Sequence, residues 1–467
     1  MKALKPLVIS GREVLPLIEG GKGIGVTDGK SSGAWAAAGA VGTFSGVSAD
    51  FYDESGNLIL PVYHKTIRKE RHEELVQYAI RGAITQAQIA HEISNGQGCI
   101  HMNVLWGISS VEMMIEAVFE RVSELIDGIT CGAGLPFKLA EVASKYKVFY
   151  YPIISSARAF SLLWRRAYSS FKEWLGGVVY EDPWKAGGHN GLSNSENPDI
   201  PEPPYYRVAA LRKVMREFGL HDVPIIMAGG VWSLKDWEDW IDNPELGSIA
   251  FQFGTRPLLT VESPISPAWK NKLLTLGEGD VCLNHFSPTG FYSSAVKNSF
   301  FYELQERASH QVSYSLEPTG ENTILIHVGH NNRAVFLREE DSEKVKIWLA
   351  QGFTEALRTP DSTIIFVTPE RSSQILTDQK NCAGCLLYCR FSNWCQDEKF
   401  AAGRIPDPRS YCIRQTLSSI IHGGSVENNL MFAGHSAHLF AQDPFYANGF
   451  VPTVKELIDR ILEERKG

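Results

Sequence analysis

From about residue 100 onward, short apolar segments alternate with segments of helical periodicity. The apolar segments include 99–105, 128–136 and 176–181, and most of them end in glycine, serine or threonine. The first helical segment follows Ser109 and Ser110, which are suitable capping residues, and it repeats apolar residues at steps of three and four. Continuous apolar strands separated by amphipathic helices predict an α/β fold with a parallel sheet covered by helices.

Two architectures fit this pattern: a closed (β/α)₈ TIM barrel and a doubly wound open sheet. Glycine loops follow several of the expected strands, as at 229–230 and 254, whereas an open sheet needs such a loop mainly at one switch point. We therefore expect the barrel, whose active sites lie at the carboxyl ends of its strands.

Residues 303–375 interrupt the alternation of strands and helices, because they contain several strand-like segments and one expected helix, over 342–357. We predict three parts: a TIM barrel in 1–302, a small inserted α+β subdomain in 303–375, and a cysteine-rich segment with a C-terminal helix in 376–467. The inserted part is interpreted as a packing or dimerisation module.

Charge and hydropathy exclude several classes of partner. The formal net charge is −8, and no dense block of lysine and arginine is present, so nucleic acid is not an expected partner. No run of eighteen apolar residues occurs, so we expect no membrane span and a cytoplasmic location. Cysteines in a reducing compartment are free thiols, metal ligands or catalysts rather than disulfides.

Five of the eight cysteines lie between residues 382 and 412. Four have the spacing Cys382-x₂-Cys385-x₃-Cys389-x₅-Cys395, and Cys412 follows. Zinc sites favour two separated C-x₂-C pairs, whereas an iron–sulfur cluster tolerates three close cysteines and a remote one. The spacing favours a cluster and leaves its fourth ligand open.

Two consecutive strand ends carry the expected phosphate site. Gly229 and Gly230 lie between a strand and a helix expected to begin at Ser233, and Gly254 and Thr255 end the next strand. Adjacent loops of this kind, near a helix N-terminus, form an anion cradle, and the last two loops of a barrel are its usual phosphate site. Because no G-x-G-x-x-G follows a first strand, we expect FMN rather than FAD.

His189 lies in the glycine-rich segment AGGHNG (186–191), which is typical of a loop rather than a helix or strand. A histidine over the mouth of a barrel can act as a general base near neutral pH. A loop histidine that only hydrogen-bonds to the backbone is an equally good interpretation of this residue alone.

Together the segments LIEGGKGIGV, AGGHNG, AGGV and FQFGTR resemble the nitronate monooxygenase (2-nitropropane dioxygenase) superfamily of FMN barrels. Within it, ITCGAGLP, YPIISSARAF, SPTGFYSSAVKNSFF and Tyr411-Cys412-Ile413 are similar to the flavin and iron–sulfur acyl-carrier-protein dehydrogenase/isomerases of bacterial unsaturated fatty acid synthesis. The resemblance covers roughly 1–300 and 380–467.

The resemblance implies a role for each of a set of residues. Flavin contacts would be Gly20, Gly21 and Asn103; Gly187 and Gly188 would line the ring; Gly229, Gly230, Gly254 and Thr255 would hold the phosphate; and Gln252 occupies the family's glutamine position. His189 would be the catalytic base. A [4Fe–4S] cluster would be held by Cys382, Cys385, Cys389 and Cys412, leaving Cys395 as a spare. Lys22 stands where the family usually has methionine.

These assignments predict an enzyme that moves hydride between FMN and an acyl thioester, either a small molecule or borne on acyl carrier protein. The enzymatic alternative is the oxidation of alkyl nitronates with oxygen. The non-enzymatic alternative is an iron–sulfur flavoprotein that passes electrons to a partner, with a structural His189. A homodimer is our working hypothesis for the oligomeric state.

Overall fold

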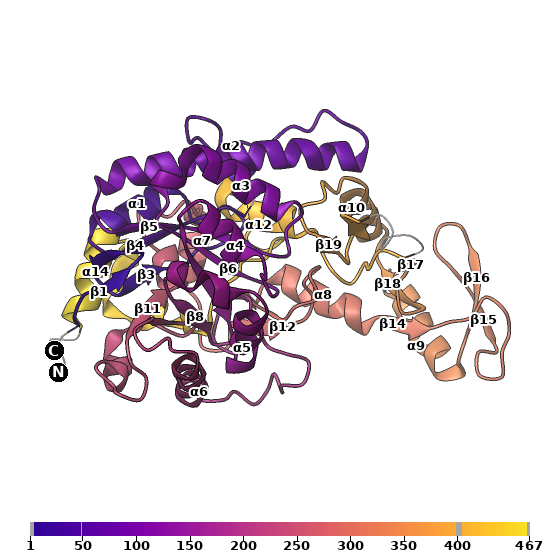
Figure 1. The fold of residues 1–467 in the computed structure, drawn as a ribbon. Helices are drawn as coiled ribbons and strands as arrows, with labels where there is room; N and C mark the ends of the chain where they lie inside the picture. The colour runs from indigo at the N-terminus through magenta and orange to yellow at the C-terminus, as the bar shows by residue number, and fades with distance from the viewer. Residues whose placement is uncertain (1–3, 48, 398–403, 465–467) are drawn as a thin grey trace.

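The computed structural model describes residues 4–47, 49–397 and 404–464, and its centre is a closed barrel of parallel strands (Figure 1). Eight strands follow one another around the barrel in chain order, and β11 pairs with β3 to close it. The prediction of a TIM barrel is therefore confirmed. The strands are β3 (Leu17–Glu19), β4 (Val41–Ser45), β5 (Cys99–Leu105), β6 (Gly128–Gly132), β7 (Phe149–Ile154), β8 (Val178–Glu181), β10 (Ile225–Ala228) and β11 (Ile249–Phe253).

A short hairpin closes the amino-terminal end of the barrel. Its strands β1 (Leu7–Ile9) and β2 (Arg12–Val14) pair antiparallel. Ile9 and Val14 pack in one buried cluster with residues from the barrel strands, including Val41 and Ile226. Because apolar side chains fill this end, a ligand can enter only from the carboxyl ends of the strands.

Helices cover the outside of the barrel, and the last of them comes from the end of the chain (Figure 1). α14 (Val454–Glu463) packs against α1, burying Leu457, Ile458 and Ile461. The other covering helices are α1 (Gly29–Ala37), α2 (Arg68–Ser94), α3 (Val111–Val122), α4 (Leu139–Lys145), α5 (Ala157–Arg166), α6 (Pro204–Glu217) and the 3₁₀ helix η4 (Leu234–Trp240).

The expected caps of α3 have a different role. Ser110 precedes α3 in a left-handed conformation and makes no capping hydrogen bond with its side chain. Ser109 Oγ instead donates to the carbonyl of Leu386, and Ser110 Oγ lies 3.0 Å from His72 Nε2. The capping prediction was wrong because the start of α3 is joined to the cysteine-rich segment, which offers the serines tertiary partners.

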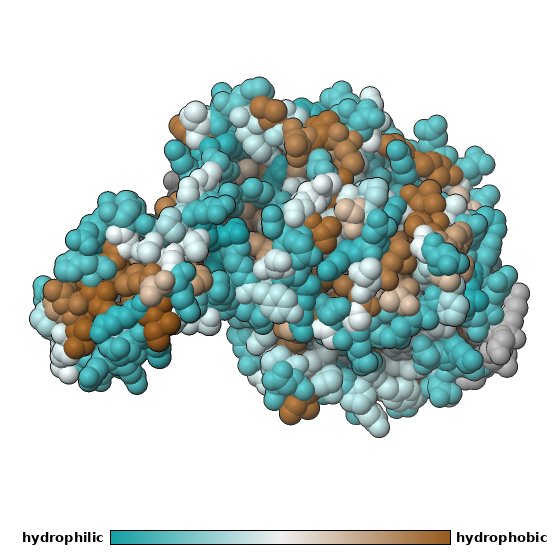
Figure 2. Space-filling view, turned by 180° about the vertical axis from the view of Figure 1, so that it is seen from behind, coloured by the Kyte–Doolittle hydropathy of each residue, from teal (hydrophilic) through white to brown (hydrophobic). Residues whose placement is uncertain are grey.

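Residues within the inserted segment have an apolar core of their own. The sheet β14–β18–β17 (Gln311–Ser313, Thr363–Val367, Glu355–Arg358) packs with α9 (Glu339–Ala350), beside the hairpin β15–β16 (Ile324–Val328, Arg333–Leu337). This segment projects from the barrel (Figure 1), and Figure 2 shows it as a separate lobe with apolar side chains on its surface. Its exposed apolar residues include Leu316, Leu325 and Ile347.

The helix expected over 342–357 was shifted and too long. The observed helix α9 ends at Ala350, and β17 begins at Glu355. Gly352 has φ +98°, a conformation that only glycine adopts readily and that cannot continue a helix. The apolar periodicity ran through this glycine and hid the turn.

The C-terminal segment packs into the same apolar core as the barrel. After α7 (Pro267–Leu273), β12 (Val281–Asn284), β13 (Ser293–Val296) and α8 (Ser299–Ser309), the chain forms the lobe and returns through α10 (Pro369–Lys380). It continues with the hairpin β19–β20 (Tyr388–Cys389, Trp394–Cys395), α12 (Ile413–His422) and α13 (Leu439–Gln442). Leu386, Leu417 and Leu430 belong to the main cluster. Among the described residues, none of the helices is both long and apolar enough to span a membrane.

Candidate active site

A single cavity lies at the carboxyl ends of the barrel strands. It encloses about 1270 Å³ of empty space, its open mouth included. Eleven residues assigned above to the flavin or to catalysis all line it: Gly20, Gly21, Asn103, Gly187, Gly188, His189, Gly229, Gly230, Gln252, Gly254 and Thr255. The fold thus brings together residues that are more than 230 positions apart in the sequence.

The loops after β10 and β11, the seventh and eighth barrel strands, offer free backbone donors. Gly229 and Gly230 have φ values of +88° and +80°, and a Cβ atom at Gly254 would meet no atom within 4 Å. Among the described residues, no protein atom accepts a hydrogen bond from the N–H groups of Gly229, Gly230, Gly254 or Thr255. Open space surrounded by unpaired N–H groups fits a phosphate.

The expected helix at Ser233 is only the short 3₁₀ helix η4, which Ser233 caps. The cradle therefore consists of loop N–H groups rather than of the end of an α-helix.

Several glycines in the cavity wall are required by close packing. A Cβ atom at Gly187 would lie 2.5 Å from the backbone of Ala433, and one at Gly21 would lie 2.2 Å from Asn103 Cβ. Gly187 therefore allows the C-terminal segment to approach the barrel mouth, a role that the sequence did not reveal. Asn103 is fixed in turn by a hydrogen bond from its Nδ2 to Thr130 Oγ1 (3.0 Å).

His189 lies on a short strand and not in the loop that its glycine neighbours predicted. Gly188–His189 form β9, which pairs antiparallel with β13, so that His189 faces Ser293 across the ladder. The prediction failed because the partner strand comes about a hundred residues later in the chain. Pairing with β13 fixes the backbone of His189 at the cavity wall.

The imidazole of His189 is held through one nitrogen. Nε2 lies 2.6 Å from Ser287 Oγ, which lies 2.8 Å from Thr289 Oγ1. Nδ1 makes no hydrogen bond to any described residue and is the nitrogen left for a substrate. Burial lowers the pKa of His189 to about 4, so the ring is neutral at pH 7 and can accept a proton.

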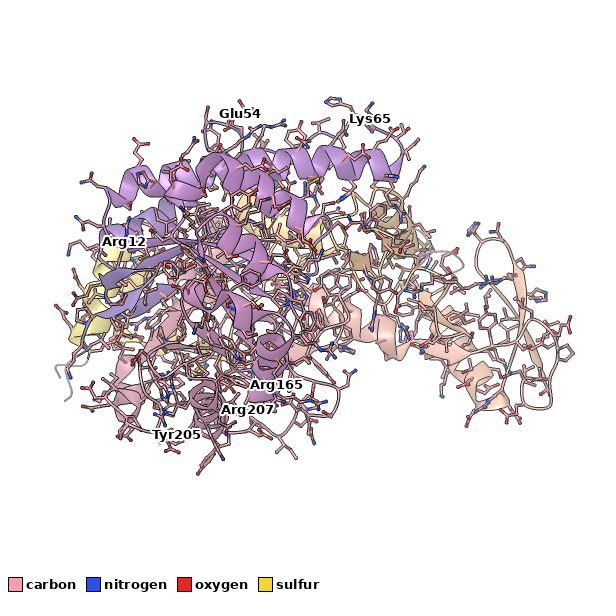
Figure 3. All side chains as sticks on the ribbon, viewed as in Figure 1. Arg12, Glu54, Lys65, Arg165, Tyr205 and Arg207 are labelled. Carbon is pink, nitrogen blue, oxygen red and sulfur yellow. The ribbon has the colours of Figure 1, made fainter. Side chains whose placement is uncertain are left out.

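The chain beyond His189 is anchored by Arg207 at the start of α6 (Figure 3). Its guanidinium pairs with Glu196 and Glu202, each at 2.7 Å, and donates to the carbonyl of Ser155 at the end of β7 (2.7 Å). Ser155 Oγ also donates to the carbonyl of Gly191. These contacts hold the segment that follows His189 against the barrel.

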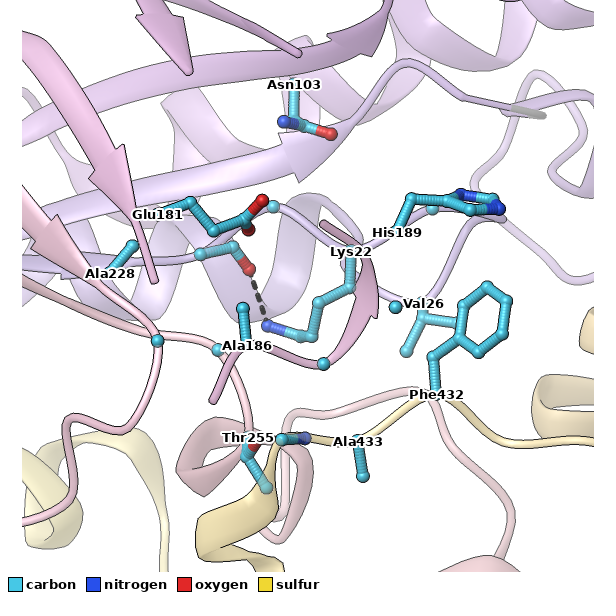
Figure 4. Close-up of a pocket in the computed structure, with 18 of the residues that line it drawn as sticks. Lys22, Val26, Asn103, Glu181, Ala186, His189, Ala228, Thr255, Phe432 and Ala433 are labelled. Atoms are coloured by element: carbon cyan, nitrogen blue, oxygen red, sulfur yellow. Dashed lines mark hydrogen bonds between the residues drawn. The ribbon is translucent and has the colours of Figure 1, made fainter. Parts of the chain in front are cut away.

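Charged groups that the sequence did not assign also line the cavity (Figure 4). Lys22 Nζ donates to the carbonyl of Gly20 (2.7 Å), and the side chain of Lys185 passes beside Gly230. Burial, reinforced by the neighbouring Asp182, raises the pKa of Glu181 to about 8. Lysines beside glycine-rich turns were a signal in the sequence, but only the fold shows that they share one cavity.

Apolar side chains form the rest of the cavity wall. They come from the loops after β3 and β4, from β5 and β7, from the 3₁₀ helix η5 (Arg256–Leu258) and from α12: Ile24, Val26, Val47, Leu105, Ile153, Leu258, Ile413, Leu417 and Ile420. Met431, Phe432 and Ala433 complete the wall from the C-terminal segment. No sequence pattern indicated this last contribution, because these residues lie almost 180 positions beyond β11.

A second cavity gathers the four cysteines assigned to the cluster. Cys382, Cys385, Cys389 and Cys412 all line it, and Cys395 does not. The Sγ atom of Cys382 accepts hydrogen bonds from Ser392 Oγ (3.0 Å) and from the N–H of Gly384 (3.4 Å). Burial and the neighbouring Cys382 raise the pKa of Cys389 to about 11.

Cys395 is kept out of this cavity by the hairpin β19–β20. The register places Cys389 opposite Trp394 and Cys395 opposite Tyr388. Opposed residues share a face of a ladder and adjacent residues alternate, so the two cysteines leave the hairpin on opposite faces.

The four cysteines line one cavity. Among the described residues, no three histidine, cysteine, aspartate or glutamate side chains are arranged to hold one metal ion. In a cubane cluster each thiolate binds a different iron, so four cysteines that line one cavity supply the number and type of donors that such a cluster needs. α12 separates the two cavities, and Ile413 lines both.

Arg256, which follows the phosphate cradle, is fully buried and ties the C-terminal segment to the barrel. Its guanidinium donates to Glu464 (2.7 Å), to the carbonyl of Trp232 (2.6 Å) and to Asp443 (3.3 Å). Replacing Arg256 with Met removes the buried cation that pairs with Glu464 and Asp443 and leaves them only the partly exposed Arg460. We therefore expect the free energy of unfolding to fall by about 3–5 kcal/mol. Urea denaturation measures this loss.

The exposed Arg158 provides the control, because Arg158→Met removes the same groups from the surface of α5. This variant should stay within about 0.5 kcal/mol of the parent protein. Equal stability of the two variants would contradict the anchoring role of Arg256.

Comparison with known proteins agrees with this architecture. Residues 61–364, more than half of the chain, match the family model described as nitronate monooxygenase. The enoyl reductase domain of MlnA from the macrolactin biosynthesis cluster of Bacillus amyloliquefaciens has 14% identity and a TM-score of 0.54, over 97% of this chain and 94% of that one. FabK from Thermotoga maritima has 15% identity and a TM-score of 0.50, over 97% and 92%. At these identities the two structures share the fold. No match was found among curated proteins.

Proposed function

Since this chain belongs to the nitronate monooxygenase family and is therefore an FMN-dependent oxidoreductase, we propose that it exchanges hydride between FMN and an acyl thioester. The thioester is a small molecule or is borne on acyl carrier protein, and the reaction is dehydrogenation with isomerisation, or reduction. We further propose that His189 is the base and that Cys382, Cys385, Cys389 and Cys412 hold a [4Fe–4S] cluster.

The observation that carries the acyl assignment is the composition of the cavity wall. The glycine cradle and His189 share one cavity with apolar side chains of the β3 turn and α12, such as Val26, Leu417 and Ile420. An acyl chain needs an apolar wall beside the reacting carbons, whereas a small nitronate needs only the polar end. One structural neighbour, the MlnA domain, is itself named an enoyl reductase.

The residues divide the chemistry between holding the cofactor and moving a proton. The N–H groups of Gly229, Gly230, Gly254 and Thr255 would hold the FMN phosphate. When bound, FMN supplies the acceptor or donor of hydride at the β-carbon of the substrate. His189 Nδ1 removes or returns the α-proton, while Ser287 Oγ holds Nε2 and so orients the ring. The apolar wall excludes water from the reacting carbons.

The cluster assignment is supported by the separation of the five cysteines. Four line one cavity: Cys382 and Cys385 lie in the segment after α10, Cys389 ends β19, and Cys412 immediately precedes α12. Hydrogen bonds to Cys382 Sγ from Ser392 and Gly384 suit a thiolate ligand. Thiolates supplied from two segments tie the C-terminal region together, so the cluster would also stabilise the fold.

The test uses anaerobically purified protein. We expect denaturation to release FMN and not FAD, and we expect iron and acid-labile sulfide in the same sample. Long-chain acyl thioesters, as coenzyme A and acyl-carrier-protein derivatives, should bleach the flavin absorbance without oxygen, and turnover should rise with chain length.

Nitronate oxidation is the second candidate, because the description of the matching family model names it. Nitroalkanes and their nitronates are therefore screened in parallel. Rapid oxygen-dependent turnover of short nitronates, with no bleaching by any acyl thioester, would reject the acyl assignment. Release of FAD instead of FMN on denaturation would reject the proposal that the glycine loops bind the single phosphate of FMN.

A further inference from the structure

Lys22 places an ammonium group in the wall of the proposed flavin cavity. Its side chain is only 15% exposed, and Nζ lies 3.6 Å from Glu19 Oε1 in addition to its hydrogen bond to the carbonyl of Gly20. Figure 4 shows Lys22 extending between Glu181 and Ala186, with the bond to Gly20 dashed.

Lys22 and Lys185 lie at different parts of the cavity wall. Gly20, which accepts the bond from Lys22, lies beside Gln252 and Gly254, and Gly21 packs on Asn103. The second lysine of the cavity, Lys185, lies at the other place: a Cβ atom at Gly230 would be 2.8 Å from Lys185 Cδ. Lys185 therefore lies at the Gly229–Gly230 loop, whereas Lys22 lies at the Gly20–Gly21 turn, which the resemblance assigns to flavin contacts.

One carboxylate faces Lys22 directly. Glu19 is fully buried and accepts a hydrogen bond from Ser31 Oγ, and burial raises its pKa while the Lys22 ammonium opposes that rise. Glu181, across the cavity, is protonated at pH 7 because burial raises its pKa to about 8. Burial also lowers the pKa of Lys22, and the Glu19 carboxylate opposes that fall. Glu19 is thus the group that sets how much of the Lys22 charge the cavity experiences.

We propose that Lys22 is the ring-facing cation of this enzyme and that it stabilises the reduced flavin. This proposal rests on the FMN part of the proposed function. A neutral oxidised ring that accepts hydride, which brings two electrons and one proton, gains one negative charge and needs no further proton. A cation held in a poorly hydrated wall stabilises that charge, and charge near the ring is one way in which a protein sets the potential of its flavin.

The direction of the reaction follows from this charge. A flavin that is easily reduced accepts hydride from a saturated acyl chain more readily than it returns hydride to an enoyl chain. The ammonium of Lys22 therefore favours dehydrogenation over enoyl reduction, which narrows the proposed function.

The experiment compares three variants loaded with FMN. Lys22→Met removes the charge at similar length, Lys22→Arg keeps it, and Glu19→Gln removes the counter-charge. The readouts are the midpoint potential of the bound flavin and its affinity for sulfite, which adds to the ring and leaves it negatively charged. Lys22→Met should weaken sulfite binding and the equilibrium constant for two-electron reduction by about tenfold or more, or about 30 mV. Lys22→Arg should stay within about threefold, and Glu19→Gln should shift both quantities in the opposite direction.

The contrary outcomes are equally specific. A Lys22→Met protein that binds FMN with unchanged potential and sulfite affinity overturns the proposal. So does one that binds FMN more weakly at unchanged potential, because that places the lysine at the phosphate. If Lys22→Met fails to fold because Glu19 loses its cation, the double variant Glu19→Gln/Lys22→Met is compared with Glu19→Gln, and the same tenfold loss is expected.

None of these readouts uses a substrate. Expected shifts in potential together with a failed acyl screen would reject the substrate assignment and leave Lys22 in place. Normal acyl turnover, together with an unchanged flavin potential in Lys22→Met, would reject the role of Lys22 and leave the substrate assignment in place.

Discussion

Replacement of His189 by alanine is expected to lower turnover by about 10²–10⁴, the usual contribution of a positioned general base, while FMN stays bound. The flavin should remain because backbone N–H groups of Gly229, Gly230 and Gly254, and not the imidazole, form the cradle. Steady-state kinetics with an accepted acyl thioester, and the flavin content of the purified variant, give the two numbers needed.

His91→Ala is the matched control, because His91 is an exposed histidine in the last turn of α2, outside the cavity. It should leave turnover within twofold or so of the parent. An unchanged rate in His189→Ala would show that His189 only supports the β9–β13 pairing.

The pH profile provides a separate check on His189. Its pKa lies near 4, below the ordinary value, because burial disfavours the charged ring. The neutral ring is the base, so activity that depends on it should be constant from pH 5 to pH 7 and should be lost as the pH falls through about 4. A half-maximal rate near pH 6.5 would indicate a solvated histidine and contradict the buried environment.

Replacement of Cys412 by serine is expected to abolish the iron–sulfur cluster, whereas Cys395→Ser should retain full iron and sulfide. Cys412 lines the cavity with Cys382, Cys385 and Cys389, and Cys395 leaves its hairpin on the other face. Iron and sulfide analysis of anaerobically purified variants tests the difference directly. Because thiolate ligation is coupled to folding, Cys412→Ser should also lower the midpoint of thermal unfolding by several degrees.

The two serine variants serve as controls for each other, since each removes one sulfur atom from the same segment. If Cys412→Ser retained the cluster and Cys395→Ser lost it, Cys395 rather than Cys412 would be the fourth ligand. Stoichiometric zinc without sulfide in the parent protein would replace the cluster by a zinc site.

The barrel could be predicted because its signal is local. Strands such as Ile225–Ala228 are apolar throughout and end in glycine, and this pattern marks both the strand and the face where ligands bind. The phosphate loops were visible for the same reason. β3 and β4 were harder, since β3 has three residues and its apolar character is too brief to show a period.

The parts of the site that were missed depend on distant segments. His189 is held by β13 and Ser287, which lie about a hundred residues away, and no pattern around His189 indicates them. The Met431–Ala433 wall is farther still. For the cysteines, spacing left Cys395 and Cys412 open, and only the resemblance and the opposite faces of the hairpin distinguish them.

The return of the chain to the barrel also sets an order of assembly during synthesis. β11 ends at Phe253, but α14, which packs on α1, and the wall at Met431–Ala433 emerge about two hundred residues later. At about 5–20 residues per second, translation of that stretch takes about 10–40 s. Throughout this interval the nascent chain holds all eight barrel strands and an incomplete cavity, with Arg256 lacking Glu464. Capture of the cofactor in its finished site is therefore one of the last events in the making of the molecule.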